Sequence, residues 1–125
     1  MSFISIEIID SESGLEWCIP LKSRITILRG DSGRGKTEMV NIIRNNVFGV
    51  SIKSKLPLIV VDSSNWEILM LNTKESILIF DNMIEIESYR FYEIMEKTEH
   101  NDNYYLIIGR EYIEDKYNSL NIIKE

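Results

Sequence analysis

The sequence contains no alanine, no glutamine, one cysteine and one histidine. A single cysteine, Cys18, excludes an internal disulfide bond and a metal site built from several cysteines. A single histidine, His100, excludes a metal site with two histidine ligands, and a serine–histidine–aspartate triad would have to use that residue. With so little cysteine, we expect the reducing environment of the cytoplasm.

Long hydrophobic runs and a basic N-terminus are also missing. The longest uninterrupted apolar run, Leu56 to Val61, covers six residues and is too short to cross a bilayer. The first ten residues carry no basic segment and end on an acid, so we expect no secretory signal and no membrane partner. Fourteen Lys and Arg against twenty Asp and Glu give a net charge of −6, which argues against broad binding to nucleic acids.

What is present is a chain of 125 residues, of which 44% are apolar and 27% charged. This composition is typical of a folded, soluble domain that can bury a core without disulfides or a structural metal. No repeat, low-complexity tract or linker rich in proline, glycine or serine divides the sequence. We therefore expect residues 1–125 to form one domain.

The apolar pattern predicts an α/β architecture. Short apolar segments that indicate buried strands lie at residues 25–28, 58–61, 77–80 and 105–108. Helical patterns cover residues 37–48, 64–71 and 86–98, a β-hairpin is expected over residues 3–19, and a last strand at 119–123. Because strands alternate with helices, we expect a mostly parallel sheet with helices on both faces and an added N-terminal β-hairpin.

One segment carries a recognisable chemical motif, G-x-x-x-x-G-K-T. Its residues are Gly30, Asp31, Ser32, Gly33, Arg34, Gly35, Lys36 and Thr37. A chain that leaves a strand in this way wraps around phosphates, with backbone N–H groups pointing inward and the next helix adding its N-terminal dipole. In such a loop Lys36 reaches the β- and γ-phosphates and the Thr37 hydroxyl binds Mg²⁺. The alternative interpretation is a glycine-rich turn with an incidental lysine.

A second candidate is Asp81, which ends the apolar segment 77–80. An acid at the end of a buried strand is typical of a Walker B motif, in which the carboxylate holds Mg²⁺ beside the phosphate loop. The alternative is an aspartate that opens a turn or caps a helix. The phosphate motif upstream favours the metal-binding interpretation for Asp81 and Thr37 together.

These motifs resemble those of a P-loop NTPase of the additional-strand division, which includes AAA+, RecA-like and ABC-type ATPases. The resemblance implies a three-layer fold in which the strand at residues 105–108 lies between the strand before the phosphate loop and the strand before Asp81. It also implies ATP and Mg²⁺ as ligands. Arg110 follows the inserted strand and resembles the sensor arginine of that group, which faces the γ-phosphate.

The sequence departs from this family directly after Asp81. ABC-type and many AAA+ enzymes have a glutamate there as the catalytic base, whereas this chain has Asn82, which cannot act as a base. Glu85 is a nearby acid that could take the role, and its alternative is a solvated acid in the first turn of a helix. The chain lacks the glutamine of a Q-loop and the N-K-x-D sequence of GTPases, so nothing selects guanine.

Two functions are compatible with these residues. The first is a small ATP- and Mg²⁺-binding protein, either a slow ATPase or a nucleotide-dependent switch, completed by a protein partner or by self-assembly. In an assembly, an arginine of one protomer would serve the phosphate of the next; the candidates are Arg24, Arg29, Arg34 and Arg110. The second is a non-catalytic interaction or inhibitor protein on a P-loop scaffold, of the kind that a mobile element encodes. The sequence leaves open whether ATP is hydrolysed.

Overall fold

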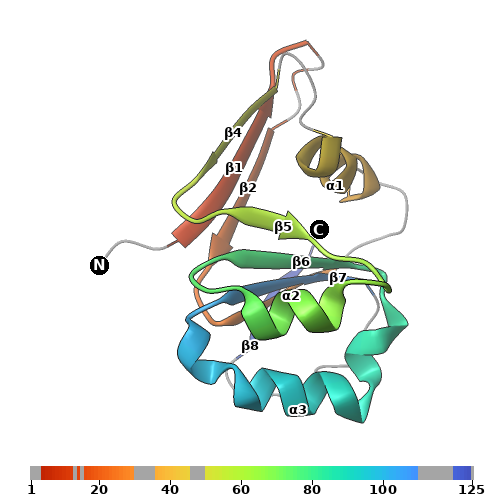
Figure 1. Cartoon of the computed structure of the whole chain (residues 1–125). Helices are drawn as coiled ribbons and strands as arrows, with labels where there is room; N and C mark the ends of the chain where they lie inside the picture. The colour runs from red at the N-terminus through yellow and green to blue at the C-terminus, as the bar shows by residue number, and fades with distance from the viewer. Residues whose placement is uncertain are drawn as a thin grey trace.

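The computed structural model describes residues 4–12, 14, 16–29, 36–45, 50–109 and 120–124 (Figure 1). Its strands are β1 (Ile4–Asp10), β2 (Glu16–Leu21), β3 (Ile25–Arg29), β4 (Val50–Ser54), β5 (Leu58–Val60), β6 (Ile77–Asp81), β7 (Tyr104–Ile108) and β8 (Leu120–Lys124). Its helices are α1 (Lys36–Asn45), α2 (Trp66–Asn72) and α3 (Tyr89–Lys97), with short 3₁₀ turns η1 (Ile84–Glu87) and η2 (Glu99–Asn101).

The N-terminal part of the chain forms an antiparallel sheet of three strands, in the order β2-β1-β4. Along β1, buried Ile6 and Ile8 alternate with exposed Glu7, because successive side chains of a strand point to opposite faces. The expected N-terminal hairpin is confirmed, since β1 pairs antiparallel with β2. β4 is a strand that the sequence did not predict, and it pairs Ile52 with Ile8.

The second sheet has five strands in the order β5-β6-β7-β3-β8, and every neighbouring pair in it is parallel. β6 and β7 lie in its interior, and their residues Ile77–Phe80 and Tyr105–Ile108 are buried throughout. This burial on both faces explains why these segments are continuously apolar. As expected from the sequence, β7 lies between β6 and β3.

One face of the parallel sheet is covered by α2 and α3 (Figure 1). Phe80 of β6 meets Phe91 of α3 edge to face, with 5.3 Å between ring centroids. Trp66 at the start of α2 lies 6.0 Å from the same Phe91 ring. Edge-to-face and tilted ring pairs of this kind add to the stabilisation from burial. The aromatic side chains therefore fix both helices against the sheet.

The opposite face corrects the expected architecture. A three-layer P-loop NTPase-like fold with helices on both faces is wrong for this chain, because the antiparallel sheet, together with α1, packs there. Ile6 and Ile19 of the antiparallel sheet and Met39 of α1 share a core with Ile79 and Leu106 of the parallel sheet. The physical reason lies in the alternating pattern of the antiparallel strands, which places apolar side chains on one face of that sheet. This apolar face is buried when it packs face to face on the parallel sheet.

Candidate functional site

The carboxyl ends of β3, β7 and β6 lie side by side at one edge of the parallel sheet. The strand register places Leu28 of β3 and Asp81 of β6 level with Ile108 of β7. The Gly109 N–H donates to the Leu28 carbonyl at 3.4 Å, and the Asn82 N–H donates to the Ile108 carbonyl at 2.8 Å. Two strand spacings, about 10 Å, therefore separate the end of β3 from Asp81.

The glycine-rich motif begins at this edge. β3 ends at Arg29, and α1 begins at Lys36 and continues through Thr37. Gly30–Gly35 lie outside the described residues, as do the side chains of Lys36 and Thr37. What the structure supports is the context that the motif requires: the segment leaves an interior parallel strand and opens a helix. That helix is anchored by Met39, which is buried in the core.

Asp81 occupies the end of β6 with its carboxylate partly buried. Burial raises the pKa of Asp81, and the positive charge of Arg44 on α1 opposes that rise. In the described part of the chain, its hydrogen bond comes from the Asn82 amide at 3.4 Å. The Asp81 carboxylate is therefore costly to keep ionised and is weakly satisfied by the described residues, which is a common property of functional carboxylates.

The turn after Asp81 is held close to the end of β7. Asn82 adopts a left-handed conformation with φ of 52°, which asparagine tolerates better than most residues. A Cβ atom placed on Gly109 would lie 3.3 Å from the Asn82 Oδ1 atom, so glycine permits this close approach. The next helix, α3, is capped further along the chain by Ser88, which accepts from the Phe91 N–H at 3.2 Å.

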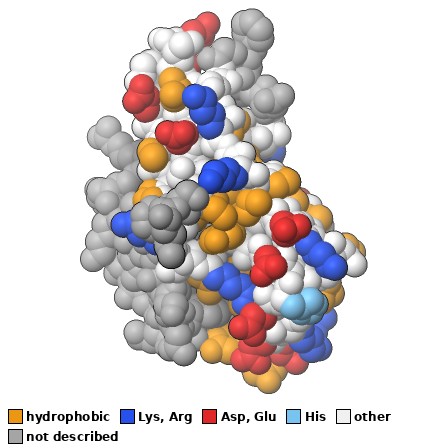
Figure 2. All heavy atoms as spheres, turned by 90° about the vertical axis from the view of Figure 1, so that its left-hand side faces the viewer, with side chains coloured by type: hydrophobic (Ala, Val, Ile, Leu, Met, Phe, Trp, Pro, Cys, Tyr) orange, Lys and Arg blue, Asp and Glu red, His pale blue; other side chains and the backbone are white. Residues whose placement is uncertain are grey.

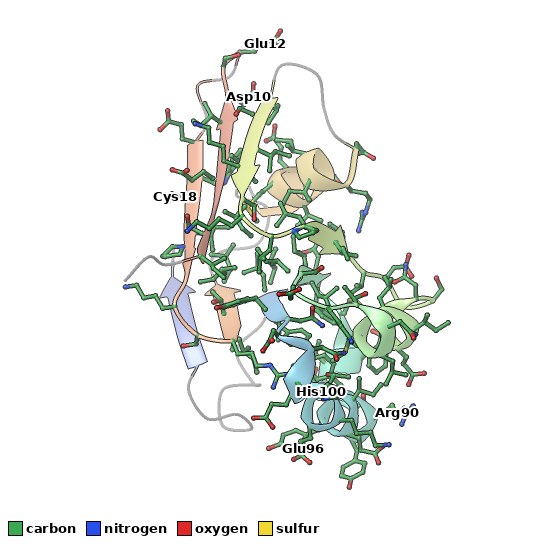
Figure 3. The ribbon with its side chains drawn as sticks, turned by 60° about the vertical axis from the view of Figure 1, so that its left-hand side comes forward. Asp10, Glu12, Cys18, Arg90, Glu96 and His100 are labelled. Atoms are coloured by element: carbon green, nitrogen blue, oxygen red, sulfur yellow. The ribbon has the colours of Figure 1, made fainter. Side chains whose placement is uncertain are left out.

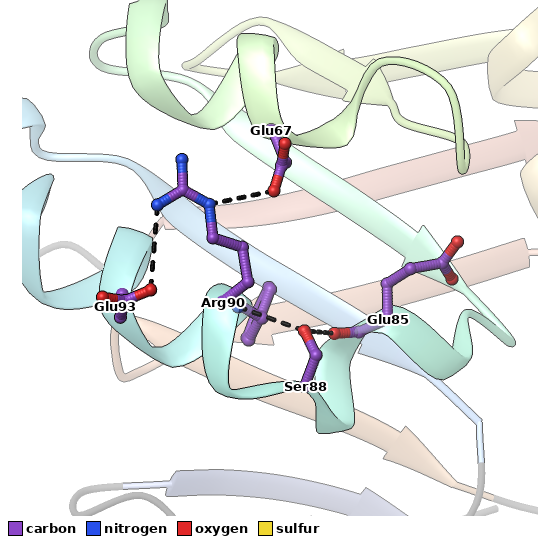
Figure 4. A network of polar contacts seen from close by, with 6 residues as sticks. Glu67, Glu85, Ser88, Arg90 and Glu93 are labelled. Carbon is purple, nitrogen blue, oxygen red and sulfur yellow. Dashed lines mark hydrogen bonds and ion pairs between the residues drawn. The ribbon is translucent and has the colours of Figure 1, made fainter.

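Glu85 lies in η1, four residues after Asp81. Its backbone carbonyl accepts the Ser88 hydroxyl at 2.6 Å, and its side chain extends away from the ion pairs of Arg90 (Figure 4). Arg90 instead joins α2 to α3, with its Nε 3.0 Å from Glu67 and its Nη1 3.7 Å from Glu93. The side chain of Glu85 is therefore not held in that network. Arg110 lies outside the described residues.

Two charged residues at this edge were missed as site candidates. Asp62 follows β5, and its carboxylate accepts from the Ser64 hydroxyl at 2.6 Å and the Ser64 N–H at 2.8 Å. These hydrogen bonds, the hydroxyl first, lower the pKa of Asp62, with a smaller contribution from Arg44. Asp62 thus opens the turn into α2, a structural role. Arg44 could not be placed from sequence, because its proximity to both carboxylates depends on how α1 packs.

The described residues contain no group of three or more His, Cys, Asp and Glu side chains that could hold a metal by themselves. Mg²⁺ is usually held by one or two protein ligands together with substrate phosphates and water. A single partly exposed carboxylate such as Asp81, at the same edge of the sheet as the start of the glycine-rich segment, fits that requirement. A Mg²⁺ ion at this edge would depend on the nucleotide for most of its ligands.

No protein-family model matches the sequence, and no curated protein matches it either. Within the described ranges, no helix is long and apolar enough to span a bilayer. The resemblance to P-loop NTPases therefore rests on the residues of this chain alone, namely Gly30–Thr37 and Asp81.

Proposed function

We propose that the chain binds the phosphates of ATP together with Mg²⁺ at the carboxyl edge of its parallel sheet. The observation that carries the proposal is the position of the two motifs. The glycine-rich segment leaves β3 beside β7, and Asp81 ends the strand on the other side of β7. Ligands of open α/β sheets bind outside the carboxyl ends of the strands, where both motifs lie.

Each residue has a role in this proposal. The backbone N–H groups of residues 33–37 and the N-terminus of α1 hold phosphate oxygens. Lys36 neutralises the β- and γ-phosphates, while Thr37 and Asp81 hold Mg²⁺. Bound Mg²⁺ would neutralise negative charge on the phosphates. Asp81 and Glu85 are the carboxylates available to orient a water molecule, and Arg110 is the arginine proposed to sense the γ-phosphate.

We further propose that the protein is a slow ATPase or a nucleotide-dependent switch, completed by a protein partner or by self-assembly. Ile84 and Tyr89 support an interaction surface beside the site, because they are 76% and 79% exposed and follow Asp81 closely in the chain. Exposed large apolar side chains that gather in one patch often mark a binding surface. A non-catalytic interaction protein on the same scaffold is the alternative, and it would use the same surface.

Titration calorimetry with ATP, ADP and GTP, each with and without Mg²⁺, tests nucleotide binding directly. Lys36→Ala removes a charge-assisted contact to phosphate, so we expect ATP affinity to fall by about 10–100-fold. Lys53→Ala is the matched control, because Lys53 is exposed on β4 in the other sheet. Equal ATP affinity of the two variants, with both folded by circular dichroism, would refute the proposed nucleotide site.

A further inference from the structure

A hollow of about 390 Å³ opens at the amino edge of the parallel sheet, opposite the edge that carries Asp81. Its lining includes Lys22, Ser23 and Arg24 before β3, and Glu99, Asp102 and Asn103 before β7. Small-molecule sites typically occupy about 300–1,000 Å³. Arg24 lies just before β3, whereas the glycine-rich segment follows it. At about 3.3 Å per residue, Ile25 and Arg29 are about 13 Å apart along β3, so this hollow is separate from the end of the strand where the motif begins.

The positive wall of the hollow is formed around Arg24. Its guanidinium carbon lies 5.5 Å from the centroid of the Tyr105 ring, and its Nη2 donates to the Met95 carbonyl at 3.3 Å. Its Nε is buried without a hydrogen-bond partner. Among the described residues, no carboxylate forms an ion pair with Arg24. A guanidinium prefers two parallel hydrogen bonds to a carboxylate. Among the described residues, the Arg24 guanidinium instead contacts the Tyr105 ring and the Met95 carbonyl.

The negative wall is formed by Glu99 and Asp102, which are both exposed. Neither carboxylate forms an ion pair or hydrogen bond with another described residue. The turn that carries them is fixed from below by buried Asn103, whose side chain accepts the Ser76 N–H at 3.1 Å and donates to the Thr73 carbonyl at 2.8 Å. The acidic wall is therefore held in place by hydrogen bonds between the Asn103 side chain and backbone groups, while its charges stay available.

Figure 2 faces this edge and shows acidic and basic side chains close together around the single histidine on the lower half of the molecule. Opposite charges that line one hollow without pairing attract a ligand that carries both signs. A ligand with negative charge alone would be attracted by Arg24 and repelled by Glu99 and Asp102, and a cation would meet the reverse. The two walls together therefore select a dipolar molecule.

We propose that this hollow binds a free α-amino acid, with its carboxylate at Arg24 and its ammonium group between Glu99 and Asp102. The carboxylate accepts from the Nη groups of Arg24, because the Nε atom is buried and out of a ligand's reach. The ammonium group supplies donors to two carboxylates that have no other partner in the described structure. This inference goes beyond the proposed nucleotide site and does not depend on it.

Calorimetry of the full chain with each standard L-amino acid at millimolar concentration tests the proposal. We expect binding of at least one of them. N-acetylation removes the ammonium charge and amidation removes the carboxylate, so each modification of the best ligand should weaken binding by about 10–100-fold. No binding by any amino acid, or equal affinity for the acetylated form, would overturn the proposal.

Asp102→Asn is the most informative variant, because Asp102 has φ of 57° and asparagine adopts this left-handed conformation readily. We expect it to weaken binding of the free amino acid but not of the N-acetylated one. Glu96→Gln is the control, since Glu96 is exposed on α3 and does not line the hollow (Figure 3). Equal effects of the two variants would contradict the proposal, and Lys36→Ala should leave amino-acid affinity unchanged even if it abolishes ATP binding.

Discussion

Asp62 and Asp81 occupy equivalent positions at the ends of neighbouring parallel strands, yet their surroundings shift their pKa values in opposite directions. Hydrogen bonds from Ser64 favour the charged form of Asp62 and lower its pKa. Burial disfavours the charged form of Asp81 and raises its pKa. The charge of Asp62 therefore stabilises the folded chain at neutral pH, whereas the charge of Asp81 destabilises it. A destabilising charge that the fold retains is expected where that charge serves a ligand.

Asp81→Asn keeps the shape of the side chain and removes the charge that attracts Mg²⁺. We expect a greater loss of affinity for ATP with Mg²⁺ than for ATP alone, measured by calorimetry in both conditions. We also expect a higher melting temperature for the variant at pH 7, because a partly buried charge is removed. Equal losses of affinity with and without the metal would assign Asp81 a purely structural role.

The pH dependence of stability separates the two aspartates. The unfolded pKa of both is near 3.8. The Asp81 charge lowers the stability of the folded chain progressively as pH rises from 3.8 through the higher folded pKa. The gain in stability of Asp81→Asn over the wild type should therefore be largest above this pH range. Asp62→Asn should lose a constant amount of stability above pH 3.8 and approach the wild type as pH falls below it. Urea unfolding between acidic and neutral pH measures both curves.

The sequence was sufficient to select Asp81, because an acid directly after four apolar strand residues is a local pattern. It could not select Arg44, whose charge acts on Asp62 and Asp81 across tertiary contacts. The sequence could not show either that Arg24 forms no ion pair with another described residue. Nothing in the local sequence shows that the Arg24 guanidinium lies over Tyr105, since β3 and β7 become neighbours only in the folded sheet.

Among the elements, α3 depends on a single side chain for its beginning. Ser88 accepts a hydrogen bond from the Phe91 N–H and donates to the Glu85 carbonyl, so it joins α3 to η1 (Figure 4). Ser88→Ala removes this N-cap and should reduce the free energy of unfolding by about 1 kcal/mol. Ser63→Ala, at an exposed turn position, is the control. Equal stability of the two variants in urea would show that the cap contributes nothing measurable.

Elements with a strong apolar pattern were predicted well. β6 and β7 are continuously apolar, and the structure extends each of them by one residue beyond the segments 77–80 and 105–108. β4 was missed because its five residues, Val50–Ser54, carry a lysine and only half-buried apolar side chains. Such a strand is defined by pairing with β1 rather than by its own composition. α1 covers Lys36–Asn45, and the last part of the expected helix, residues 46–48, lies outside the described residues.

The proposed nucleotide site has no glutamate directly after Asp81. Asn82 occupies the position of the usual base, and general-base assistance typically contributes about 10²–10⁴-fold. An arginine supplied by a partner contributes about 10³–10⁵-fold in related phosphoryl transfers. We therefore expect the isolated chain to release phosphate from ATP slowly in a steady-state assay. Turnover of many ATP molecules per second, abolished in Glu85→Gln, would instead identify a complete enzyme with Glu85 as its base.

For the whole molecule, the layers that cover the parallel sheet were predicted wrongly from the sequence. Burial of both faces of β6 was correctly inferred, but helices were assumed to cover both. The N-terminal hairpin packs on the second face with β4 and α1, and no pattern in residues 46–57 indicates this arrangement. The sequence of a buried strand does not show whether helices or a second sheet cover it, because any apolar face of suitable shape can bury the same strand.

The pairing of β3 with β8 has a consequence for synthesis of the chain. Ile25 pairs with Leu120, so the strand that leads into the glycine-rich segment gains its second neighbour only when the C-terminal residues have left the ribosome. Until then, one edge of β3 presents unpaired backbone groups, which can recruit a strand of another chain. Contacts this distant in sequence also form slowly. Nascent chains stalled before Leu120 should therefore aggregate more readily than chains that contain residues 120–124.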